Sequence, residues 1–173
     1  MKLFEYQAKE LFAEAGIPVP RAELVEAASA DANAAERFGE AVSEAAGRLL
    51  SGDGGASRVV VKSQLLMGGR GKAGLIKRAG SAEEAGGYAA EFFSGEHQVR
   101  AVLVEEAVDI ARELYLSISA DPANARFVVL ASAEGGVEIE ELALARPDAV
   151  RRVGVDVHRG LQPYQARGLA YDL

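Results

Sequence analysis

The sequence predicts an α/β fold, because strand-like and helix-like segments are interleaved along its 173 residues. Residues 58–63 and 101–104 are short, apolar and rich in valine, as buried strands are. Between them, residues 81–84 read Ser-Ala-Glu-Glu, the capping-box pattern of a helix start, and we expect this helix to reach about residue 93. A glycine-rich run at residues 68–74 follows the first of these strands and is the most informative segment of the chain.

The N-terminal third of the chain is predicted to be mainly helical. Residues 3–15 have helical periodicity, and Gly16 suits the left-handed end of that helix. Four residues make its apolar stripe: Leu3, Leu11, Phe12 and Ala15. Residues 22–50 are alanine-rich with charges at helical spacing, which predicts one or two surface helices, and residues 51–55 predict a flexible connection.

The C-terminal part predicts a hairpin followed by two short helical segments. In residues 113–120, leucine and isoleucine alternate with other residues as in a half-buried strand, and residues 121–124 have turn chemistry before a strand at residues 127–130. Pro147 is expected to open a short helix through residue 152. Residues 162–173 predict the start of another helix; because the chain ends inside this pattern, we expect a fragment of a longer protein.

Composition excludes several classes of function. The chain has no cysteine, which excludes disulfides and thiol catalysis and argues against structural zinc; its two histidines are too far apart to suggest a local metal motif. A net charge of −7 argues against a general nucleic-acid binder. There is no apolar run of membrane-spanning length and no apolar block near the start, so we expect a cytoplasmic protein.

The glycine-rich run concentrates positive charge in this acidic chain. Residues 62–78 contain five cations and no acid, and residues 69–74 match G-x-G-x-x-G. A dinucleotide-binding loop should open a helix, whereas residues 75–78 look like a strand. The P-loop pattern also fails, because Leu66 replaces its first glycine and Ala73 replaces its Ser or Thr. What remains is a turn between two strands that covers phosphates, or a solvated hairpin with incidental cations.

Each charged residue around this loop allows more than one interpretation. Lys62 ends its strand beside the loop and could pair with a phosphate, or could be a solvated strand end. Glu105 and Glu106 follow one strand, and Glu113 opens another. Such carboxylates could accept hydrogen bonds from ribose hydroxyls or an adenine amine, could help to hold Lys62, or could be solvated strand ends.

Longer signatures in a fixed order give a more specific indication. The chain resembles the N-terminal ATP-grasp region of the β subunit of succinate–CoA ligase (succinyl-CoA synthetase). Matching segments run from end to end: residues 3–12, 16–20, 68–74, 104–106, 112–115, 131–140 and 163–167. Residues 22–57 are the least similar to the family.

The resemblance implies a truncated ATP-grasp fold, with the N-terminal lobe and the start of the second lobe. Residues 21–108 would form the inserted lobe that carries the phosphate loop. Residues 1–20 and 109–173 would form the first part of the other lobe.

The resemblance also implies the nucleotide-binding residues. They are Lys62, Gly69, Arg70, Gly71, Glu105, Val108 and Glu113. The lysine and the loop would contact phosphates, Glu105 the base or ribose, Val108 the nucleotide through its backbone only, and Glu113 would be a further acid of the site. Leu66 and Met67 differ from the histidine and alanine of some members, so ATP and GTP both stay open.

In the family, ATP or GTP phosphorylates a histidine of the partner α subunit, the phosphate moves to succinate, and CoA captures the acyl phosphate. The resemblance places the Mg²⁺ ligands beyond residue 173 and no catalytic residue within the fragment, which is therefore expected to be inactive alone. Two alternatives stay open: a related acyl-CoA ligase of the malate–CoA ligase or ATP-citrate lyase type, and a non-catalytic interaction fragment.

Overall fold

The computed structural model describes residues 2–51 and 55–173, so part of the predicted connection at residues 51–55 lies outside the described residues. The chain forms two compact units, Met1–Val108 and Asp109–Leu173. Residues 1–20 belong to the first unit; their expected grouping with the segment after residue 108 stays a prediction. No helix in the described part of the chain is long and apolar enough to cross a membrane.

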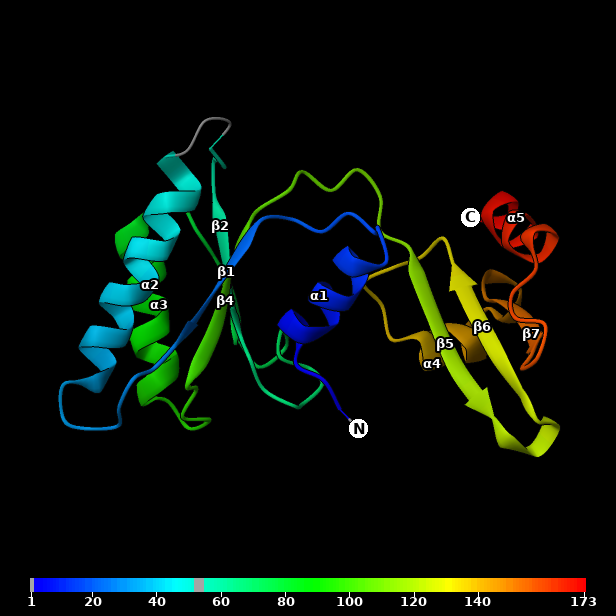
Figure 1. The fold of residues 1–173 in the computed structure, drawn as a ribbon, viewed down its shortest axis with the longest axis horizontal. Coiled ribbons are helices and arrows are strands. Elements are labelled where there is room, and N and C mark those ends of the chain that lie inside the picture. The colour runs from blue at the N-terminus through cyan, green and yellow to red at the C-terminus, as the bar shows by residue number, and fades with distance from the viewer. Residues whose placement is uncertain (1, 52–54) are drawn as a thin grey trace. The chain divides into compact units, whose positions relative to one another are not determined.

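The first unit is an antiparallel sheet with helices on both sides. Its strands lie in the order β1-β4-β2-β3. Their bounds are Ala22–Glu26 for β1, Val59–Ser63 for β2, Ile76–Ala79 for β3 and Ala101–Glu106 for β4. Helices α2 (Ala34–Ser51) and α3 (Ala82–Ser94) cover one face, and α1 (Glu5–Glu14) lies on the opposite side of the sheet (Figure 1).

Side chains that point alternately to the two sides of the sheet give it one apolar face and one polar face. On β2, Val59 and Val61 are fully buried against α2 and α3, as are Val102 and Val104 of β4. Because successive strand residues point to opposite faces, Lys62 is directed to the side on which α1 lies. The core therefore fixes a lysine on the face opposite α2 and α3.

Close backbone packing holds α2 against α3. Gly39 and Gly86 face each other where the helices meet: a Cβ on Gly86 would lie 2.6 Å from the Gly39 carbonyl oxygen, and one on Gly39 would lie 2.9 Å from that of Gly86. Ser81 caps α3 as predicted, its hydroxyl accepting a hydrogen bond from the Glu84 amide at 3.2 Å. The α3 prediction is confirmed, with an end at Ser94.

Helix α1 is attached to this unit without burying a residue of its own. It ends at Glu14, and Gly16 has the left-handed conformation expected after the helix, with a φ of +77°. The amides of Gly16 and Ile17 donate to the carbonyls of Ala13 and Phe12. The expected stripe does not form a core contact, since Leu11 and Phe12 are 52% and 50% exposed. A cavity of about 340 Å³ separates part of α1 from β1 and β4.

The second unit is a three-stranded antiparallel sheet with short helices. Its strands lie in the order β5-β6-β7. The elements in chain order are β5 (Tyr115–Asp121), the 3₁₀ turn η1 (Pro122–Asn124), β6 (Arg126–Ser132), α4 (Ile139–Ala145), the 3₁₀ turn η2 (Pro147–Ala149), β7 (Arg151–Asp156) and α5 (Pro163–Asp172). The predicted hairpin and the last helix are confirmed.

Three expectations about elements are wrong in part. Residues 22–26 were expected to be helical but form β1, because they pair with β4 along their whole length; residues 34–51 are helical, with a buried face. The short helix at Pro147 ends by Ala149, since Arg151 already pairs in β7. On β5, Leu116 and Ile118 are 64% and 67% exposed, because the core of this unit lies over β6 and β7, where Leu169 of α5 packs.

Candidate phosphate-binding site

Lys62 and Glu105 lie on the same face of the sheet. Lys62 of β2 is directly opposite Leu103 of β4, and Glu105 follows two residues later on that strand. Since side chains two residues apart share a face, the lysine and the carboxylate are side by side. The structure therefore brings together two residues that are 43 positions apart in sequence.

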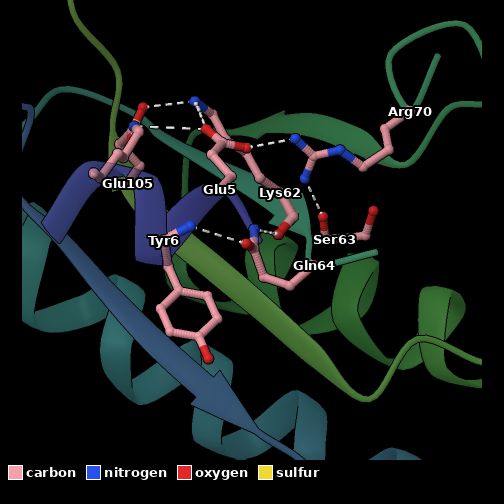
Figure 2. A network of polar contacts seen from close by, with 8 residues as sticks. Glu5, Tyr6, Lys62, Ser63, Gln64, Arg70 and Glu105 are labelled. Carbon is pink, nitrogen blue, oxygen red and sulfur yellow. Dashed lines mark hydrogen bonds and ion pairs between the residues drawn. The ribbon is translucent and has the colours of Figure 1, made fainter. Parts of the chain in front are cut away.

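Five charged side chains form one network on this face (Figure 2). Lys62 Nζ lies 2.7 Å from Glu105 Oε1 and 3.0 Å from Glu5 Oε1. The other oxygen of Glu5 lies 2.7 Å from Arg70 Nη2. Lys9 Nζ contacts Glu105 Oε2 and lies 3.6 Å from Glu5 Oε1. The network joins α1, β2, β4 and the glycine-rich loop.

Glu5 is the centre of this network, and its ionisation follows from its neighbours. Burial raises the pKa of the Glu5 carboxyl, but the charges of Lys62 and Arg70 and their hydrogen bonds outweigh burial, so that the pKa lies below its usual value. Burial, together with the charge of Lys62, lowers the pKa of Lys9 despite the attraction of Glu5. Glu5 is thus held as a carboxylate.

Backbone contacts fix the ends of the network. The Gln64 side chain accepts a hydrogen bond from the Tyr6 amide at 3.2 Å and donates to the Lys62 carbonyl at 3.0 Å. The Arg70 guanidinium also donates to the Ser63 carbonyl, which ties the loop back to β2 (Figure 2). The first turn of α1 and the loop are therefore both anchored to the end of one strand.

The loop joins two antiparallel strands, as predicted, and does not open a helix. Internal hydrogen bonds shape it: Ala73 N–H donates to Gly69 O at 3.0 Å, and Leu75 N–H to Arg70 O at 2.9 Å. Gly69 has a φ of +73°, which accounts for glycine there. Gly68 and Gly71 are not in the left-handed region, and within the described structure a Cβ on either would meet no atom within 4 Å.

The seven predicted site residues have different outcomes. Lys62, Arg70 and Glu105 meet in the network, and Gly69 and Gly71 flank Arg70 in the loop. Glu105 is 5% exposed and holds Lys62, which is one of the three roles expected for it; contact with a base or ribose stays a prediction.

The other two of the seven residues, Val108 and Glu113, are not members of the five-residue network. Val108 is half exposed at the end of the first unit. Glu113 belongs to the second unit, where its carbonyl accepts a hydrogen bond from Gly135 at 3.1 Å. The neighbouring candidate Glu106 pairs with Arg21 at the surface, at 2.8 Å, which is the structural role expected as its alternative. Their contacts with a nucleotide stay predictions.

Sequence reasoning missed Glu5 and Lys9. Their four-residue spacing on α1 was visible, but it predicts only a pair on the surface of the helix. The partners of both residues come from strands more than 50 positions away, and no local pattern encodes that contact. Within residues 2–51 and 55–173, no group of three His, Cys, Asp or Glu side chains could hold a metal ion.

The fold and the loop identify the class of protein. Residues 2–173 match the ATP-grasp domain, and the chain belongs to the ATP-grasp family. The predicted fold class, an α/β ATP-grasp fold that is truncated relative to its relatives, is confirmed.

Curated relatives of the chain are subunits of CoA ligases. The chain is 46% identical, over its full length, to the ADP-forming sulfoacetate–CoA ligase subunit SauC of Bilophila wadsworthia. It is 40% identical over 183 aligned residues, again covering all of the chain, to the ADP-forming succinate–CoA ligase β subunit of Geobacter sulfurreducens. It spans 42% and 43% of the length of these two proteins. The resemblance to succinate–CoA ligase β subunits is confirmed.

Solved structures support the fold. A dinucleotide-forming acetyl-coenzyme A synthetase of Ca. Korarchaeum cryptofilum, in complex with coenzyme A and Ca-AMPCP, superimposes with a TM-score of 0.67. The match covers 98% of this chain and 66% of that one, at 18% identity. At this identity the likeness concerns the architecture alone.

Proposed function

We propose that this chain is the nucleotide-binding part of the β subunit of a succinate–CoA ligase. The complete enzyme would interconvert succinate, CoA and ATP or GTP with succinyl-CoA, the nucleoside diphosphate and phosphate. It would act through a phosphohistidine on an α-subunit partner, in the cytoplasm and in the tricarboxylic acid cycle. Mg²⁺ would be bound by residues beyond position 173, and the chain alone would not turn over.

The observation that carries this proposal is the pairing of Lys62 and Arg70 on one carboxylate beside the glycine-rich loop. Carboxylate and phosphate oxygens accept the same hydrogen bonds from lysine and arginine. Two cations that share a carboxylate therefore have the spacing and the charge to share a phosphate. Gly68 and Gly71 add to this, since neither backbone conformation nor neighbouring atoms require glycine there. Open backbone at both positions leaves room for a polyphosphate to approach.

The acyl substrate is a separate question. The 46% identity to a sulfoacetate–CoA ligase subunit supports a second candidate, a ligase for a sulfonated acid in place of succinate. Malate and citrate are further alternatives from the sequence. Each of these enzymes would use the same nucleotide site, so the nucleotide experiment below applies to all of them.

Calorimetric titration of the 173-residue chain with Mg-ATP and with Mg-GTP tests the nucleotide site. We expect saturable binding of one of them and at least a tenfold loss in Lys62→Ala. The matched control is Arg78→Ala, which removes the same charge from an exposed position on β3 and should leave the affinity within about twofold. Absence of binding in a folded chain, or an equal loss in both variants, would contradict the proposal and favour a non-catalytic interaction fragment.

A further inference from the structure

The Glu5 carboxylate occupies the place on the two cations that a phosphate would need. Its Oε1 lies 3.0 Å from Lys62 and its Oε2 lies 2.7 Å from Arg70, so one anionic group bridges both (Figure 2). A phosphate that binds the same two donors needs two oxygens in nearly the same positions. Carboxylate and phosphate cannot both fill them, and the side chain must move when the phosphate arrives.

Charge balance favours this exchange. The network contains three cations, Lys9, Lys62 and Arg70, and two carboxylates, Glu5 and Glu105, which leaves one net positive charge. If Glu5 leaves, the remaining groups carry two net positive charges, which better match a polyphosphate. Glu5 is also the more accessible acid, since its side chain is 21% exposed and that of Glu105 is 7% exposed.

Few apolar contacts hold the helix that carries Glu5. No residue of α1 is buried, its apolar side chains Leu11 and Phe12 are half exposed, and a cavity of about 340 Å³ lies between the helix and the sheet. Polar contacts from its first two turns anchor it: Glu5 to Lys62 and Arg70, Lys9 to Glu105, and Tyr6 to Gln64. Loss of the Glu5 contacts removes a large share of this attachment.

We propose that Glu5 is a built-in competitor for phosphate: a nucleotide polyphosphate displaces it from Lys62 and Arg70, which sets the affinity of the site and loosens α1. The inference rests on the proposed function, because it assumes that phosphate binds these two cations. In the absence of nucleotide, Glu5 keeps the pair in place and compensates their charge. Binding then exchanges one anion for another and is coupled to a movement of the N-terminal helix.

Titration with inorganic tripolyphosphate isolates the phosphate contribution from that of the base. We expect Glu5→Gln, which keeps the shape of the side chain and removes its charge, to bind tripolyphosphate about tenfold more tightly than the unchanged chain, or ~1.4 kcal/mol. Glu10→Gln is the matched control: it removes the same charge from an exposed position of the same helix and should change the affinity by less than twofold. A merely structural Glu5 would weaken binding when replaced.

The outcomes separate this inference from the proposed function. If tripolyphosphate binds and Lys62→Ala abolishes binding, but Glu5→Gln binds equally or more weakly, the competitor role is refuted and the phosphate site stands. If no variant binds, both fail.

Hydrogen exchange of the unchanged chain gives an independent test that needs no variant. The amides of α1 should exchange faster when tripolyphosphate is bound, while those of α3 should not. Unchanged or slower exchange in α1 would overturn the proposed release of the helix.

Discussion

Replacing Glu105 by glutamine should destabilise the first unit strongly. Each carboxylate oxygen contacts a different lysine, Oε1 meeting Lys62 and Oε2 meeting Lys9. A glutamine side chain can present its oxygen to only one of them. Its NH₂ group then faces the ammonium of the other lysine, and no hydrogen bond forms because both groups are donors. The two lysines are left with Glu5 as their shared carboxylate.

The size of the effect follows from burial. Removing one partner of a buried ion pair costs roughly 3–5 kcal/mol, because the other charge stays out of water. The side chain of Glu105 is 7% exposed, but those of Lys62 and Lys9 are 19% and 20% exposed and can be partly rehydrated. We therefore expect a loss at the lower end, about 3 kcal/mol. That is a large part of the stability of an ordinary domain.

Urea unfolding followed by circular dichroism measures this loss. The matched control is Glu23→Gln, which breaks the surface pair with Arg48 at 2.6 Å, where the side chains are 33% and 59% exposed. Surface pairs contribute about 0–1 kcal/mol, so the control should change little. If Glu105→Gln costs less than 1 kcal/mol, or no more than the control, the reasoning about the buried network is refuted.

Two further predictions concern the loop and acid pH. Gly69→Ala should lower the free energy of unfolding by about 1–2 kcal/mol, because alanine is disfavoured at a φ of +73°. Gly71→Ala should leave stability within about 0.5 kcal/mol and weaken Mg-nucleotide binding, because Gly71 is not in the left-handed region and a Cβ there would meet no described atom within 4 Å. Equal stability losses in the two variants would contradict this difference between the two glycines. The lowered pKa of Glu5 means that its contribution is present above its usual value of 4.5 and is lost as the pH falls through the folded-state pKa. The urea midpoint should therefore decline below about pH 4.5, and less steeply in Glu5→Gln; identical slopes would contradict the assignment.

Elements with local signals were predictable from the sequence. Ser81 caps α3 and Gly16 makes the left-handed turn after α1, because the chemistry of a cap lies within a few residues of the helix end. The strand–loop–strand arrangement around Gly69–Gly74 was also predicted, since a strand signal on both sides excludes the helix that a dinucleotide loop would open.

Features that depend on long-range contacts were not predictable. Ala22–Glu26 has helix-forming residues, yet it becomes β1 because pairing with β4 outweighs local preference. The network shows the same limit: Lys62 was identified from the loop beside it, but Glu5 is 57 residues away and gains its role only when α1 lies against the sheet. The exposed face of β5 could not be foreseen, because it depends on where the core of the second unit lies.

The glycine contact between α2 and α3 has a mechanical consequence for the first unit. Because the backbones meet at Gly39 and Gly86 without side chains between them, neither helix can roll or slide without a collision of main-chain atoms. We therefore expect the two helices and the sheet, which share one core, to move as one rigid body. We expect any deformation that accompanies nucleotide binding to be concentrated in the glycine-rich loop and in α1, which has no buried residue.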